Sequence, residues 1–116
     1  MPADDEDQSS VDEQQRLRAR RAADEAADPE RLLPGEDPSS MQPDDARLWI
    51  DVYSELLDYK RALLEVTEQK LARMRDEPSR REVVETDEVV IGAECRRFEQ
   101  RLGFWKRRLD EAESRA

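Results

Sequence analysis

The sequence predicts an all-α protein: a long antiparallel helical hairpin, coiled-coil-like, that follows a largely disordered acidic N-terminal tail. The composition is one reason, because 43% of the residues are charged and only three are glycine, which is typical of long helices. The second reason is periodicity. Apolar residues recur every seven positions along two stretches that Pro78 separates. A chain of 116 residues accommodates at most one such domain.

Residues 1–43 are predicted to be an acidic, mostly disordered tail and linker. Apolar residues are sparse there and prolines interrupt its second half, which favours disorder. Residues 1–46 carry fourteen acids against five bases, whereas the remaining seventy carry sixteen against fifteen. The stretch "SSVDEQQRLRARRAADEAAD" can form one marginal helix, with Ser10 as N-cap because Glu13 follows three positions later.

The hairpin is expected over residues 44–116, and its first helix over 44–77. Asp44 or Asp45 is the expected N-cap. The helix should end near a turn at Pro78, because proline disfavours helical geometry at the preceding residue. Its apolar arc, roughly 160° wide at about 100° per residue, is too broad for a single neighbour. The arc contains the rows Trp49, Leu56, Leu63; Ile50, Leu57, Leu64, Leu71; Val52, Tyr59, Val66; and Tyr53 with Met74.

The second helix is expected over residues 79–115, with a narrow apolar seam. Its opening "EVVETDEVVI" weakens helix propensity, so residues 79–87 could instead be a loop. We expect a continuous helix because Val84 keeps the seven-residue phase. The seam combines Val84, Ile91, Phe98, Trp105 and Ala112 with Cys95, Leu102 and Leu109.

Folding the two helices back on each other about Pro78 gives a specific pairing, in which the two residue numbers add to about 157–158. It pairs Met74 with Val84, Val66 with Ile91, Leu63 with Cys95, Tyr59 with Phe98, Leu56 with Leu102, Val52 with Trp105, and Trp49 with Leu109. One row of the first helix is then left without a partner, and long exposed apolar rows mark interfaces. The predicted partner-binding residues are therefore Ile50, Leu57, Leu64 and Leu71, together with Phe104 and Arg107, which point away from the seam.

No residue pattern in the chain suggests catalysis. Histidine is absent, which removes the commonest general base and metal ligand, and a single cysteine cannot form an internal disulfide. Acid pairs on the first helix fall on its solvated side, so we expect no catalytic residue, no metal and no cofactor. We expect Cys95 to be a small buried hydrophobe. No apolar stretch reaches membrane-spanning length and the N-terminus is acidic, so a cytoplasmic protein is expected.

These features predict a non-enzymatic interaction or adaptor protein that docks on a protein partner or self-associates as a dimer forming a four-helix bundle. The net charge of −10 disfavours direct binding of nucleic acid. The tail could mask the cationic cluster Arg101, Lys106, Arg107 and Arg108, or attract a basic partner. The alternative is a small bacterial regulator that binds RNA polymerase or a sigma-like factor, with the tail mimicking nucleic-acid charge. The sequence leaves the partner and the oligomeric state open.

Overall fold

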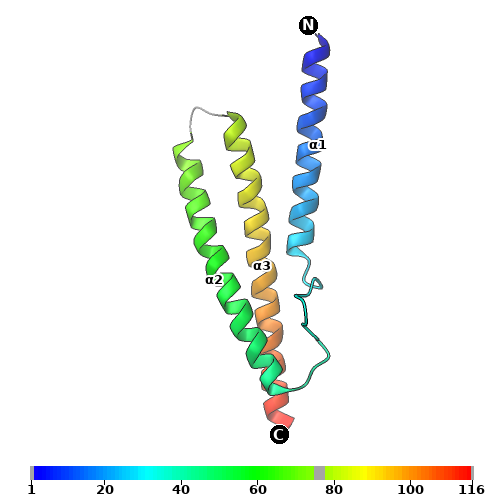
Figure 1. The fold of residues 1–116 in the computed structure, drawn as a ribbon, viewed down its shortest axis with the longest axis vertical. Helices are drawn as coiled ribbons and strands as arrows, with labels where there is room; N and C mark the ends of the chain where they lie inside the picture. Colours follow the sequence, from blue (N-terminus) through cyan, green and yellow to red (C-terminus); the bar gives the residue numbers. More distant parts are fainter. Residues whose placement is uncertain (1, 75–77, 116) are drawn as a thin grey trace.

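The computed structural model describes residues 2–74 and 78–115, which are all-helical apart from one connection, with no strand in these ranges. The helices are α1 (Pro2–Ala27), α2 (Pro43–Arg73) and α3 (Pro78–Arg115). α3 lies in the middle, with α2 on one side and α1 on the other, and α1 makes no contact with α2 over the described residues (Figure 1). α1 and α3 run in the same direction, and α2 runs opposite to both (Figure 1). None of the described helices is long and apolar enough to cross a membrane.

α3 is continuous from Pro78 through the valine-rich stretch, and its seam is the one that the heptad pattern predicts. Burial follows that pattern along the whole helix, because each seam residue is buried or packs half-buried against the core. The buried members are Val84, Ile91, Cys95, Phe98, Trp105 and Ala112, and the half-buried ones are Leu102 and Leu109. The prediction for this face of α3 is confirmed.

The predicted face of α2 is wrong in part: Trp49, Leu56 and Leu63 pack against the core, but the row of Val52, Tyr59 and Val66 does not. Tyr59 and Val66, which should have paired with seam residues, are 63% and 60% exposed. Tyr53 is instead fully buried, and Leu57 is only 3% exposed. α2 is therefore rotated about its own axis relative to the expected pairing, and its row that begins at Ile50 faces the core.

Two ion pairs between α2 and α3 are compatible with this orientation of α2. Lys60 contacts Glu94 at 3.2 Å, and Arg61 contacts Glu99 at 3.0 Å. Successive helical residues are about 100° apart, so Tyr59 and Arg61 point in directions that differ by roughly 160°. If Tyr59 faced α3, Arg61 would point away from α3 and could not reach Glu99. The positions of Lys60 and Arg61 therefore favour the observed orientation of α2. The pairing predicted from the sequence considered only apolar residues and did not include these charges.

The start of α2 also differs from the prediction. The helix begins at Pro43, and Gln42 occupies the N-cap position without a side-chain hydrogen bond to the helix. Proline suits the first helical position because its missing N–H has no partner there. Asp44 and Asp45 lie in the first turn, where carboxylates interact favourably with the helix dipole. The helix ends at Arg73, earlier than predicted, and Met74 is its C-cap; the predicted last residues, 75–77, lie outside the described residues.

α1 is longer than the marginal helix expected from the sequence. It begins at Pro2, so Ser10 lies inside the helix and is not its N-cap. Its apolar side chains bury little surface, since Val11 and Leu17 are exposed. The less exposed side chains of α1, which packs against α3, are mostly alanine. They are Asp12, Ala19, Ala23, Ala26 and Ala27.

Candidate functional site

Residues 28–42, here called the strap, connect α1 to α2 and lie along α3 (Figure 1). Three successive turns form most of it, Asp28–Arg31, Leu33–Glu36 and Asp37–Ser40, each closed by a backbone hydrogen bond of 3.0–3.1 Å. Each turn has proline at its second position, where the fixed φ angle suits the turn. The predicted disorder is therefore wrong for this part of the tail, because the prolines shape turns that pack against a helix.

The central turn positions the side chain of Glu36. In "LPGE", Gly35 has a φ of 82°, which is the left-handed conformation that the third position of a type II turn requires. The N–H of Leu33 donates to Glu36 Oε1 at 3.0 Å, across the turn. The turn thus holds the Glu36 carboxylate against α2 and α3.

The carboxylate of Glu36 is the centre of a buried hydrogen-bond network, and its side chain is 0% exposed. Oε1 accepts hydrogen bonds from Leu33 N–H and from the hydroxyl of Tyr53 on α2. Oε2 accepts from Trp105 Nε1 at 2.7 Å and from Arg101 Nε and Nη2 at 3.1 and 2.5 Å. Charge-assisted bonds of this kind are stronger than neutral ones. Glu36 therefore joins the strap to both long helices.

Three arginines on one side of α3 bind the backbone of the strap region. Arg97, Arg101 and Arg108 follow each other at intervals of four and seven residues, which places them on a common face. They donate to backbone carbonyl oxygens at the end of α1 and in the strap. The acceptors are Ala26 (2.9 Å) and Arg31 (3.1 Å) for Arg97, Pro29 (3.5 Å) for Arg101, and Pro38 and Ser40 (both 2.7 Å) for Arg108.

Phe104 lies within this arginine row. Its ring meets the Trp105 ring edge-on, with 5.1 Å between centroids. The guanidinium groups of Arg101 and Arg108 lie 4.4 and 5.0 Å from its centroid, which is cation–π geometry. The prediction that Phe104 is an exposed anchor is wrong, because it is half-buried on the face that the strap occupies.

The network changes the acidity of its members. Burial would raise the pKa of Glu36, but the hydrogen bonds from Tyr53, Leu33, Arg101 and Trp105 outweigh that effect and hold this pKa below its ordinary value. Burial, followed by the bond to Glu36, raises the pKa of Tyr53 to about 12. Burial also lowers the pKa of Arg97, and the nearby charge of Arg31 adds to this effect. Glu36 is thus held as an anion and Tyr53 as a neutral donor.

The remaining predicted partner-binding residues are distributed differently from the expectation. Leu57 and Leu71 are only 3% and 7% exposed, so they cannot form an open row. Ile50 and Leu64 are half-buried and pack against the core. Arg107 is exposed, as expected. The rotation of α2 therefore exposes a different set of apolar side chains.

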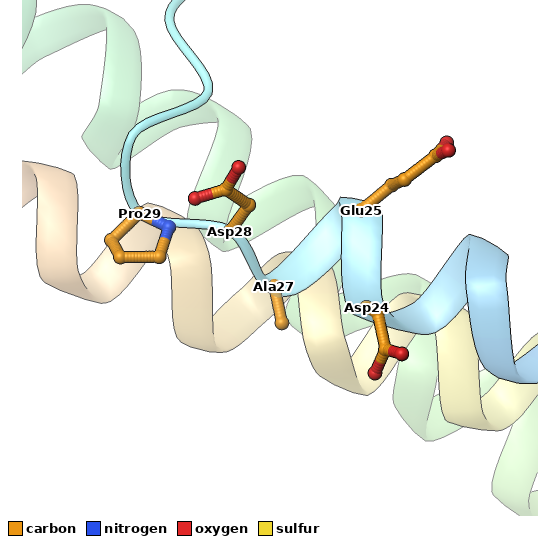
Figure 2. Close-up of a pocket in the computed structure, with 5 residues that line it drawn as sticks. All are labelled: Asp24, Glu25, Ala27, Asp28 and Pro29. Atoms are coloured by element: carbon orange, nitrogen blue, oxygen red, sulfur yellow. The ribbon is translucent and has the colours of Figure 1, made fainter.

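Two further groups with potential chemistry do not form a site. A depression of about 490 Å³ lies where α1 meets the strap. The carboxylates of Asp24, Glu25 and Asp28, which line it, point in different directions (Figure 2). No cluster able to hold a metal ion occurs among the described residues. Cys95 is buried in the seam, and that burial raises the pKa of its thiol, which disfavours the reactive thiolate.

Sequence reasoning missed the strap, although signals for it are present. "DPER", "LPGE" and "DPSS" each place proline at the second position of a turn, and the last two add Gly or Ser where turns favour them. The arginine spacing on α3 was a second signal. Within the described residues, every buried side-chain nitrogen and oxygen has a partner, so the network is internally complete. No protein-family model, curated protein or solved structure matches the chain significantly.

Proposed function

We propose that this chain is a non-enzymatic interaction or adaptor protein, in which α2 and α3 act as a coiled-coil-like hairpin that docks on a protein partner. The observation that carries the proposal is the exposure of large apolar side chains, Tyr59 and Val66, on the outer side of α2. In a chain with only 36% hydrophobic residues, leaving such side chains in water is costly unless another surface covers them.

The polar network supports a scaffolding role over a chemical one. All five donors to Glu36 belong to the protein itself, and they tie the strap to α2 and α3. A catalytic carboxylate needs contact with a substrate, which a side chain enclosed in this way does not offer. The network instead keeps α2 and α3 in a fixed arrangement, so that the hairpin presents a constant surface to a protein partner.

Purification of the full chain from its native host, followed by identification of co-purifying proteins and by sedimentation, tests this function. We expect a protein partner in a fixed ratio to the chain, or a defined self-associated species. A chain that purifies alone and sediments as a monomer would overturn the proposal.

A regulator that binds RNA polymerase or a sigma-like factor is a second candidate. Residues 1–13 contain six acids and no base, and the N-terminal end of α1 extends beyond the start of α3 (Figure 1). A projecting acidic segment can imitate the charge of nucleic acid. Replacing Asp4, Asp5 and Asp7 by Asn in the full chain should then abolish co-purification with the polymerase. Unchanged co-purification would exclude charge mimicry by this segment.

A further inference from the structure

Four apolar residues form a continuous stripe along the outer side of α2. Leu48, Val52, Tyr59 and Val66, here called the α2 stripe, follow each other at intervals of four and seven residues. Leu48, Tyr59 and Val66 are each more than half exposed, and Val52 is partly exposed. The stripe spans nineteen residues of helix, and the eighteen steps from Leu48 to Val66 correspond to roughly 27 Å. This length matches about five turns of a partner helix.

A shallow groove adjoins the stripe. It has a volume of about 370 Å³ and lies between α2 and α3, lined by Leu63, Thr67, Asp87, Val90, Ile91 and Glu94. Leu63 follows Tyr59 by four residues and precedes Val66 by three, so it links the groove to the stripe on the helix surface. Because α1 does not reach α2 over the described residues, α1 does not cover this region.

Acidic side chains border the apolar surface on both sides. On α2, beyond the stripe, the exposed acids are Asp51, Glu55, Asp58 and Glu65. Asp87 and Glu94 lie on the opposite side, in the groove, where Glu94 is paired with Lys60. The four acids on α2 have no cationic partner among the residues that the structure describes. An apolar strip with four unpaired carboxylates on one side and Asp87 and Glu94 on the other calls for a ligand of complementary pattern.

We propose that the α2 stripe and its groove bind an amphipathic helix of a partner protein that carries aliphatic residues on one face and lysine or arginine on both flanks. This inference rests on the proposed interaction function and specifies its surface and partner class. Helices bind such surfaces through apolar anchors at intervals of three and four residues. A second copy of this chain is a poor occupant, because each copy carries a charge of −10 and a two-fold contact would bring acidic borders together.

The test uses the full chain and a synthetic 18-residue helical peptide with leucines on one face and lysines elsewhere, titrated by fluorescence anisotropy at 0.15 M salt. The double variant Tyr59→Ser/Val66→Ser should weaken binding at least tenfold. The variant Glu55→Gln/Asp58→Asn should weaken it less and reduce its dependence on salt. Circular dichroism should show the helicity of both variants unchanged, since all four side chains are exposed.

Matched controls separate this surface from general attraction between an acidic protein and a basic peptide. Val11→Ser/Leu17→Ser changes two exposed apolar residues on α1, and Asp110→Asn/Glu111→Gln removes two exposed acids on α3. Neither control should change the affinity by more than about twofold, a change of roughly 0.4 kcal/mol. Equal losses in test and control variants, or equal binding of a peptide with the same composition in scrambled order, would overturn the proposal.

Two more results would overturn the surface assignment while leaving the interaction function intact. One is a native partner that still co-purifies with the Tyr59→Ser/Val66→Ser variant. The other is a dimer in sedimentation that this variant converts to monomer, since a second copy would then occupy the stripe. Failure of the proposed function itself would appear differently, as a monomer that purifies without any partner.

Discussion

The two sides of α3 are buried by different kinds of interaction. Toward α2, α3 presents an apolar seam that contains Ile91, Phe98 and Cys95. Toward the strap, it presents Arg97, Arg101 and Arg108, which bind carbonyl oxygens and the Glu36 carboxylate. Trp105 belongs to both sides, because its ring is in the core and its Nε1 donates to Glu36. Apolar burial has no direction, whereas hydrogen bonds fix the orientation of the groups that they join.

The strap side is expected to be the more sensitive to a single change. Glu36→Gln removes the charge that balances Arg101, and both side chains are at least nine-tenths buried. Breaking a buried ion pair from one side costs about 3–5 kcal/mol, since the remaining charge stays buried without a partner. Urea unfolding should show a loss of this size in the free energy of unfolding.

The control for this change is Glu99→Gln, which breaks the pair with Arg61. Both of those side chains are about half exposed, and pairs of that kind contribute about 0–1 kcal/mol. If both variants lost the same free energy of unfolding, the Glu36 network would stabilise the fold no more than an exposed ion pair does.

The seam side can be tested by comparing two apolar residues on α2. Leu57→Ala should lower the free energy of unfolding by about 2–5 kcal/mol, because it leaves a cavity in the core. Val66→Ala should change it by less than about 0.5 kcal/mol, since this side chain is exposed. A larger loss for Val66→Ala than for Leu57→Ala, in thermal or urea unfolding, would support the orientation in which Val66 faces Ile91.

Alkaline pH provides a more selective probe of the strap side. The pKa of Tyr53 is raised from 10.0 to about 12 in the folded protein. A raised folded pKa contributes stability that is complete below pH 10 and is lost as the pH rises from 10 to about 12. A difference of about two units corresponds to roughly 3 kcal/mol at most. The free energy of unfolding should therefore fall more steeply over this range for the wild type than for Tyr53→Phe.

Tyrosinate absorbance gives the direct measurement of this pKa. The chain contains two tyrosines, so a Tyr59→Phe background leaves Tyr53 as the sole reporter. Titration should then give a midpoint near 12 while the protein remains folded. A midpoint near 10 would mean that the Tyr53 hydroxyl is in contact with water and does not donate to Glu36.

The helical class and the face of α3 were predictable, whereas the face of α2 was not. The α3 seam is narrow, so only one orientation buries Val84, Ile91, Phe98 and Trp105 together. The apolar arc of α2 is wide, and several rotations bury a similar number of apolar side chains. Counting apolar pairs therefore selected an orientation that exposes Leu57, whereas the structure buries Leu57 and pairs Lys60 and Arg61 with Glu94 and Glu99.

The candidate site was the least predictable part, because its members are far apart in the chain. Tyr53, Arg101 and Trp105 are separated from Glu36 by 17, 65 and 69 residues. The prolines around Glu36 are compatible both with a disordered linker and with rigid turns, and local sequence does not choose between them. Rigid turns are favoured only when donors on another helix bind the turn carbonyl oxygens.

The sequence by itself determined the helices and the seam of α3, because helix propensity and seven-residue periodicity act over a few turns of one segment. Only the tertiary structure decided which side of α2 is buried, and that residues 28–42 form a strap. The physical reason is that apolar surface is buried without regard to direction, whereas a buried carboxylate is stable only where donors converge on it. That convergence exists only after α2, α3 and the strap have come together.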